Sequence, residues 1–226
     1  MWQLEKINKL EPDIRTLFDM KEVIYDKQWL KNQENKNLYF MYRNIFKEED
    51  RSKIEKSGLR YDVTVIPPGM LGHEFIKTAG HYHRIAVENL SYPEVYQVLK
   101  GEAIFLIQKI DFDTNKIIDV CFSRCSVGDV FVIPPNYGHI TINHSNQELV
   151  MSNWVASNCK SNYQPIKYMG GACHFFLDEG WVKNNRYPLV PDLRELQGKK
   201  MEDMYALINT PEKLEFLKNP KIEPRI

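Results

Sequence analysis

The stretch KTAGHYHRIAVENLSYPEVYQVLKG, residues 77–101, combines strand-forming residues with two histidines and a glutamate. Successive side chains of a β-strand point to opposite faces, so His81 and His83 are expected to project to the same side. The same alternation groups Glu94 with Tyr96. Imidazole and carboxylate together suit a first-row divalent metal ion, and three such ligands leave coordination positions open for a substrate. The stretch therefore predicts half of a metal site, with a fourth ligand to come from elsewhere in the chain.

Short runs rich in Val, Ile, Tyr and Phe continue on both sides of this stretch, and turn residues such as Gly101, Gly128 and Pro134-Pro135 separate them. About nine short strands with no helical pattern between them predict an all-β fold, an antiparallel sandwich or barrel of the jelly-roll kind. The predicted strands are LYFMYRNIF (38–46), LRYDVTVI (59–66), EFIKT (74–78), EVYQVLKG (94–101), EAIFLIQKI (102–110), IIDVCFS (117–123), DVFVIPP (129–135), HITINHS (139–145) and ELVMSNWV (148–155).

The two ends of the chain show helix signals in place of the strand pattern. Near the amino terminus, Asp13 is expected to cap a helix that runs to Phe18, and Asp26 to cap another around Trp29. Near the carboxyl terminus, two helices are expected, one at 202–207 and one that begins after Thr210 as N-cap. We therefore predict three parts: an N-terminal helical arm (1–37), a barrel domain with the metal and substrate site (38–165), and a C-terminal irregular or helical extension packed on the barrel (166–226).

The composition is that of an ordinary globular protein. Of 226 residues, 43% are hydrophobic and 27% charged, and 30 basic residues balance 30 acidic ones. This balance gives no reason to expect a nucleic-acid or membrane partner. The first fifteen residues carry frequent charges and no apolar core of a signal peptide, so a cytoplasmic protein is expected. The four cysteines lack the pairing of a structural zinc site, and reduced thiols are expected.

The fourth ligand is predicted at His139, in the run GDVFVIPPNYGHITIN. Taken together, the two segments resemble the paired motifs of the cupin superfamily, whose first pattern contains H-x-H, a glutamate and a glycine six residues beyond it. The second pattern is glycine, proline, glycine, histidine and asparagine at fixed spacing. Its counterparts here are Gly128, Pro134, Asn136, His139 and Asn143.

This sequence departs from the cupin pattern at two places. Asn136 stands where glycine is usual, and asparagine tolerates the left-handed backbone that such a turn needs. Ten residues separate His83 from Glu94, where most members have a shorter link. A surface loop over residues 84–93 is expected to absorb this insertion, because lengthening a loop costs little.

A narrower resemblance is to the cupin-type glucose-6-phosphate isomerases of archaea and some bacteria, through TVIPPG (64–69), EFIKTAGHYH (74–83), PEVYQVLKG (93–101) and PPNYGHITIN (134–143). It implies a homodimeric enzyme that binds a phosphorylated hexose and one divalent metal ion per subunit, Fe²⁺ first, with Mn²⁺, Ni²⁺ or Zn²⁺ as alternatives. The implied metal ligands are His81, His83, Glu94 and His139. The implied phosphate contacts are Thr64, Thr78 and Gly80, and the implied sugar contacts Tyr39, Tyr96 and Tyr163.

The chemistry of an aldose–ketose isomerase fits these groups. Three neutral imidazoles and one carboxylate leave the metal a net positive charge, so that it acts as a Lewis acid on the open-chain sugar. Glu94 is the candidate base, or a metal ligand only, and Tyr96 is the candidate assistant in proton transfer. Lys77 and Arg43 are expected to add long-range attraction for the phosphate.

Two other functions fit the same ligand set. Three histidines and a glutamate also serve non-haem iron, so a cupin dioxygenase is one alternative. The other is a sugar-phosphate-binding protein without turnover, because Lys160 to Tyr163 read K-S-N-Y where the family's segment reads G-H-D-Y. Of the remaining histidines, His73 and His144 are expected on the surface and His174 in packing.

Overall fold

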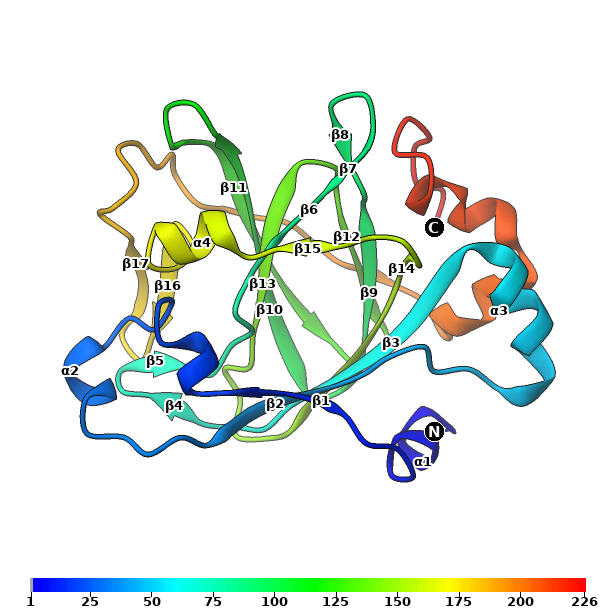
Figure 1. The fold of residues 1–226 in the computed structure, drawn as a ribbon, viewed down its shortest axis with the longest axis horizontal. Helices are drawn as coiled ribbons and strands as arrows, with labels where there is room; N and C mark the ends of the chain where they lie inside the picture. The colour runs from blue at the N-terminus through cyan, green and yellow to red at the C-terminus, as the bar shows by residue number, and fades with distance from the viewer. Residues whose placement is uncertain (1) are drawn as a thin grey trace.

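Residues 2–226 are described by a computed structural model, and strands make up most of its regular structure (Figure 1). One seven-stranded sheet has the order β1-β2-β3-β14-β9-β12-β19, and a four-stranded sheet has the order β13-β10-β11-β18. The strands are β1 (Asp13–Thr16), β2 (Asn37–Tyr42), β3 (Leu59–Ile66), β4 (Met70–Leu71), β5 (Glu74–Phe75), β6 (Tyr82–His83), β7 (Ile85–Val87), β8 (Leu90–Ser91), β9 (Glu94–Lys100), β10 (Glu102–Asp111), β11 (Lys116–Ser126), β12 (Asp129–Ile133), β13 (Tyr137–Ile142), β14 (Leu149–Ala156), β15 (Ser161–Asn162), β16 (His174–Leu177), β17 (Gly180–Lys183), β18 (Arg194–Glu195) and β19 (Lys199–Lys200).

The helices are few and short. The α-helices are α1 (Trp2–Ile7), α2 (Lys27–Leu30), α3 (Arg51–Ser57) and α4 (Gln164–Tyr168), and the 3₁₀ helices are η1 (Phe18–Met20), η2 (Glu48–Asp50), η3 (Met204–Asn209) and η4 (Pro211–Leu217). The two main sheets pack face to face with almost entirely antiparallel neighbours, which confirms the predicted all-β jelly-roll class. All nine predicted strands are present, although only Glu74 and Phe75 of the predicted strand 74–78 are in regular pairing.

One helix predicted in the N-terminal arm is wrong. Asp13 begins strand β1, which pairs antiparallel with β2, and Phe18 starts a single 3₁₀ turn. The apolar side chains at 14, 17 and 18 suggested a helical period, but pairing with the sheet edge satisfies the backbone instead. The second helix is confirmed, because the Asp26 carboxylate accepts a hydrogen bond of 2.8 Å from Trp29 N at the start of α2.

The alternation of side chains along the seven-stranded sheet separates the site from a second core. On the inner face, Tyr96 of β9 lies opposite Asn153 of β14. On the outer face, Val95 and Trp154 are fully buried. This outer face packs against α1, α3 and the C-terminal extension, which together form an apolar cluster around Trp154 and Leu214.

The C-terminal extension therefore contributes to the core rather than hanging free. Both helices predicted in it are present as 3₁₀ helices, η3 and η4, and η4 begins after Thr210 as predicted. The rest of the extension is not irregular as predicted, because it forms β16 to β19, and β18 and β19 pair with the edges of the two main sheets. Tyr205 in η3 packs its ring 5.0 Å from that of Tyr61, and the indole of Trp154 donates to Met204 O at 3.0 Å. In Figure 1 the C-terminal end of the extension, in orange and red, lies beside α3 and β9, whereas β16 and β17 of the same extension lie on the opposite side of the barrel.

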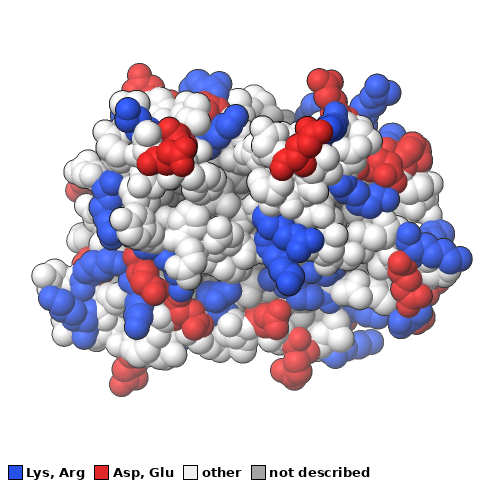
Figure 2. Space-filling view, turned by 45° about the horizontal axis from the view of Figure 1, so that its top comes forward, with Lys and Arg blue, Asp and Glu red and all other residues white. Residues whose placement is uncertain are grey.

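The surface carries both signs of charge. Figure 2 shows acidic and basic side chains interspersed over the face of the molecule drawn there. Within residues 2–226, no helix is both long and apolar enough to cross a membrane.

Candidate active site

The four predicted metal ligands meet between the two sheets. His81 pairs with His139 of β13 through reciprocal backbone hydrogen bonds of 3.2 and 3.0 Å. Glu94 begins β9 in the opposite sheet, and His83 lies in β6, which pairs with β15. One side-chain donor atom from each of these four residues lies within 4.8 Å of the others, so segments far apart in sequence build one cluster.

The donor atoms of this cluster converge on one point. The Glu94 Oε2 atom lies 3.4 Å from His83 Nε2 and 3.2 Å from His139 Nε2, and the Nε2 atoms of His81 and His83 are 3.2 Å apart. Oε2 is buried and has no hydrogen-bond partner among the described residues. A buried, unpartnered carboxylate oxygen facing imidazole nitrogens is what a divalent metal site requires, so these residues fit a metal ion.

Neighbouring groups fix the orientation of two ligands. His83 Nδ1 lies 2.8 Å from the carbonyl oxygen of Tyr92, so Nδ1 carries the proton and Nε2 offers its lone pair to the cluster. The side-chain amide of Asn153 donates a 2.6 Å hydrogen bond to Glu94 Oε1. Both residues are buried, so this bond leaves Oε2 as the oxygen that faces the histidines.

The electrostatics of the cluster differ between its ligands. Burial lowers the pKa of His83, but contacts with Cys159 and Glu94 outweigh burial and raise it from 6.5 to about 10, so a metal ion would have to displace a proton from this ring. Burial and the neighbouring imidazoles of His139 and His83 hold the pKa of His81 well below its ordinary value, so its ring stays neutral. Burial opposes ionisation of Glu94, but the adjacent imidazoles of His139 and His83 outweigh it and hold the pKa of this carboxyl well below its usual range. Burial and the nearby Glu94 raise the pKa of Tyr96, whose phenol therefore stays protonated, 3.3 Å from His139 Nε2.

A cavity opens from the cluster and includes most of the predicted substrate residues. Tyr39, Thr64, Thr78, Tyr96 and Tyr163 all line it.

Gly80 is the one predicted contact that is not part of the cavity wall. It is buried with φ +76°, and a Cβ there would collide with Ile140. The glycine thus lets the chain turn tightly into His81.

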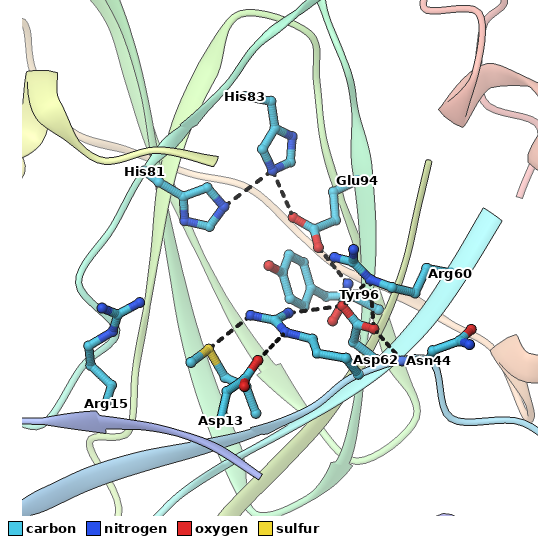
Figure 3. Close-up of polar contacts among 12 residues, drawn as sticks. Asp13, Arg15, Asn44, Arg60, Asp62, His81, His83, Glu94 and Tyr96 are labelled. Carbon is cyan, nitrogen blue, oxygen red and sulfur yellow. Dashed lines mark hydrogen bonds and ion pairs between the residues drawn. The ribbon is translucent and has the colours of Figure 1, made fainter. Parts of the chain in front are cut away.

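Several side chains of this cavity belong to no sequence motif. Arg60, Asn153 and Cys159 line its wall; the first two depend on strand register, and Cys159 lies in the link between β14 and β15. Arg43 and Arg60 converge on Asp62, each at 2.9 Å, and Asp62 is fully buried beneath the cavity (Figure 3). The alternation of polar with apolar residues in R-Y-D-V-T (60–64) was the sequence pattern that indicated polar side chains on the inner face of this strand.

The expectation for Lys77 is wrong, whereas Arg43 does line the cavity. Lys77 is only 2% exposed, and its ammonium contacts the Glu74 carboxylate and donates to Val23 O at 2.9 Å. A strand residue between Ile76 and Thr78 must point away from the face that Thr78 occupies, and here it meets a buried carboxylate.

The long insertion forms a hairpin that leaves the ligands undisturbed. Strands β7 and β8 pair with each other and project from the barrel (Figure 1). Ser91 N donates to Asn136 Oδ1 at 2.8 Å, and Asn136 N donates to Ser91 Oγ at 2.7 Å. Asn136 has φ +69°, which confirms the predicted left-handed turn. The base of the hairpin is thus bound to the second motif just before Glu94.

The other predictions for histidines hold in part. His73 is exposed and pairs with Asp178 at 3.2 Å, and His174 is buried as predicted. His144 is half-buried rather than a plain surface residue, because its ring lies near Phe176 and the Glu102 carboxylate.

Comparison with known proteins adds independent information. The model of the glucose-6-phosphate isomerase family matches residues 14–190. The glucose-6-phosphate isomerase of Thermococcus litoralis is 27% identical over 165 residues, which cover 73% of this chain and 80% of that protein. The glucose-6-phosphate isomerase of Pyrococcus furiosus is 28% identical over 178 residues, which cover 78% of this chain and 87% of that protein.

Solved structures are more distant. The oxalate decarboxylase of Lactobacillus farciminis in its formate complex superimposes with a TM-score of 0.39 and 15% identity, over 55% of this chain and 30% of that one. The family match extends over the whole of the cavity and ends before the C-terminal helices η3 and η4.

Proposed function

Because the chain belongs to the glucose-6-phosphate isomerase family, a family of aldose–ketose isomerases, we propose that it interconverts glucose 6-phosphate and fructose 6-phosphate in this cavity. The observation that carries the proposal is the cluster of His81, His83, Glu94 and His139 at the end of a cavity lined by tyrosine and threonine hydroxyls. A hexose phosphate needs two kinds of group. The His/Glu cluster would act at its reacting carbons, and the hydroxyls would bind its phosphate and sugar oxygens.

We further propose that the cluster holds one divalent metal ion, with Fe²⁺ first and Mn²⁺, Ni²⁺ or Zn²⁺ as alternatives. A bound metal would supply Lewis-acid polarisation of the sugar oxygens. Support comes from the unpartnered Glu94 Oε2 and from the neutral state of His81, since neutral imidazole is the ligand form.

The roles of Glu94 and Tyr96 follow from their hydrogen bonds. Glu94 has one oxygen bonded to Asn153 and the other facing the histidines, so we propose that it serves as a ligand. Tyr96 stays protonated and is placed to donate a hydrogen bond to a sugar oxygen. Glu94 is the only carboxylate among the cavity-lining residues, so a separate carboxylate base is missing from this wall. We therefore propose that hydrogen passes directly between C1 and C2.

The direct transfer has a simple isotope test. Conversion of fructose 6-phosphate in D₂O should give glucose 6-phosphate with little deuterium at C2, measured by NMR. Stoichiometric deuterium at C2 would instead indicate proton transfer through a base, with Glu94 as the candidate.

The remaining parts of the proposal concern the substrate and the setting. We propose that Thr64, Thr78 and the turn at Gly80 receive the phosphate, and that Tyr39 and Tyr163 lie along the sugar. The cavity lining supports the four hydroxyl residues. A homodimer is proposed from the resemblance, and a cytoplasmic setting from the charged amino-terminal residues.

A coupled assay tests the function. Fructose 6-phosphate added to metal-loaded protein should yield glucose 6-phosphate, detected by a dehydrogenase. His139→Ala should reduce the activity by several orders of magnitude because it removes a ligand, whereas His73→Ala, far from the cavity, should not. Binding of the sugar phosphate without conversion would show a binding protein instead, and oxygen consumption with an organic substrate would show a dioxygenase.

A further inference from the structure

Arg15 differs from the other arginines at this site. Arg43 and Arg60 are both ion-paired with Asp62, whereas Arg15 has no carboxylate within the 4.0 Å of an ion pair among residues 2–226. It is half-buried, and its Nε atom is buried without a hydrogen-bond partner among those residues. The charge of Asp19 acts on this guanidinium only from beyond ion-pair distance, so Arg15 keeps hydrogen-bond donors free for a ligand.

Strand pairing places Arg15 beside Tyr39, which lines the cavity, whereas Arg15 itself lies just outside the cavity lining. In the β1–β2 register Arg15 lies opposite Tyr39, so the two side chains share one face. The phenol of Tyr39 in turn accepts a 3.2 Å hydrogen bond from Ala79 N, between Thr78 and Gly80. Arg15 is therefore adjacent to the turn that contains Thr78.

The guanidinium also faces the sugar-lining residue Tyr163. Its carbon lies 5.2 Å from the centre of the Tyr163 ring, and Nη2 lies 3.5 Å from the phenol oxygen. The same ring lies 5.2 Å from the ring of His81 on the metal side. Figure 3 shows Arg15 on the side of His81 rather than of Asp62 and Arg60. One aromatic ring thus separates Arg15 from the metal cluster, a separation suited to a sugar whose phosphate is at the far end from its reacting carbons.

We propose that Arg15 binds the phosphate group of the substrate and supplies the positive charge that the threonine hydroxyls lack. The planar guanidinium presents two parallel N–H donors, which match two phosphate oxygens. The identity of the sugar rests on the proposed function, but recognition of phosphate by Arg15 does not require that the sugar be isomerised.

The test separates substrate binding from chemistry. Arg15→Gln should raise the KM for fructose 6-phosphate roughly 10- to 100-fold, the loss typical of a charge-assisted hydrogen bond, with a much smaller change in kcat. Metal content and unfolding temperature should stay as in the wild type. Arg51→Gln is the matched control, because Arg51 lies in α3 and pairs with Glu48 at 2.6 Å away from the cavity.

Arg15→Lys gives a second reading if the glutamine variant does not fold. Lysine keeps the positive charge but lacks the two parallel N–H donors of the guanidinium. The KM of this variant should therefore lie between the KM of the wild type and the roughly 10- to 100-fold higher value expected for Arg15→Gln. Unchanged KM values in either folded variant, or a fall confined to kcat, would overturn the proposal.

A binding experiment distinguishes failure of this proposal from failure of the proposed function. If the wild-type protein has no isomerase activity, the proposed function is wrong. Calorimetry with inorganic phosphate then still tests whether Arg15 binds phosphate. Tighter binding of phosphate to the wild type than to Arg15→Gln supports the proposal. Equal binding, or none to the wild type, contradicts it.

Discussion

Asn153 shows how one buried amide controls a metal ligand. Its bond to Glu94 Oε1 leaves Oε2 as the free oxygen of the carboxylate. We predict that Asn153→Ala weakens metal binding about 10- to 100-fold, the range seen when a group supporting a ligand is removed. Titration of metal-free protein followed by calorimetry measures the dissociation constant.

The exposed Asn32 provides the control for this prediction, since Asn32→Ala makes the same change outside the cavity. Equal metal affinity in Asn153→Ala and in the wild type would show that Glu94 needs no support from Asn153.

Single residues of the site were predictable where a motif records them. His81, His83, Glu94 and His139 follow from spacing, because neighbouring strands bring fixed positions together. Asn153 and Arg15 were not, because their roles depend on the registers of β14 with β9 and of β1 with β2. Register is a tertiary property, and alternation alone fixes only the face of a strand.

At the scale of elements, helix η4 is predicted to stabilise the sheet that carries Glu94. Leu214 is fully buried in the outer cluster. Leu214→Ala should lower the free energy of unfolding by about 2 to 5 kcal/mol, because it leaves a cavity in a packed core. Urea denaturation measures this loss.

Leu189→Ala is the control for this change, because Leu189 is 56% exposed. Metal affinity of folded Leu214→Ala should match the wild type, since the outer and inner faces of the sheet carry separate residues. Loss of less than about 0.5 kcal/mol, the range of surface substitutions, would contradict the role of η4 in the core.

Strand β16 carries a second prediction, on pH. Burial, helped by the nearby Lys183, lowers the pKa of His174 from 6.5 to about 4. Between pH 6.5 and pH 4 the His174 imidazole is therefore protonated in the unfolded chain but not in the folded protein. The free energy of unfolding falls as the pH drops through this range. His174→Gln should reduce this fall by at most about 1.4 kcal/mol per pH unit, measured by urea denaturation across that range.

His73 gives a control of opposite sign. Its pKa is raised by the hydrogen bond with Asp178 and by the charge of that carboxylate, so its contribution is present at low pH and is lost as pH rises. His73→Gln should leave the acid-side fall unchanged. A fall of the same slope in His174→Gln as in the wild type would contradict the assignment to His174.

Elements were predicted well in the barrel and less well at its ends. Alternating Val, Ile and Tyr between turn residues predicted the strands that carry Glu94, His139 and Asn153, but not β6, which carries His83. The helix predicted through Ile14 failed because an unpaired edge of β2 offered backbone partners that a local pattern does not reveal. The hairpin in the insertion was expected only as a loop, and its hydrogen bonds with Asn136 come from the fold.

At the scale of the whole molecule, metal binding should couple to folding. The ligands come from both sheets and from β6, so a bound ion links segments that are separate in the unfolded chain. We predict that added divalent metal raises the unfolding temperature of the wild type, in proportion to the logarithm of its free concentration at saturation. His139→Ala should show little increase, and calorimetric scans check both proteins.

The measurement that tests the central claim most directly joins metal content to turnover. Metal-free protein receives Fe²⁺ under anaerobic conditions, or Mn²⁺, Ni²⁺ or Zn²⁺ in parallel, and formation of glucose 6-phosphate from fructose 6-phosphate is followed at each step. We predict that activity rises from near zero in proportion to bound metal and reaches its limit at one ion per chain. Full activity in protein shown to contain no metal would contradict the account.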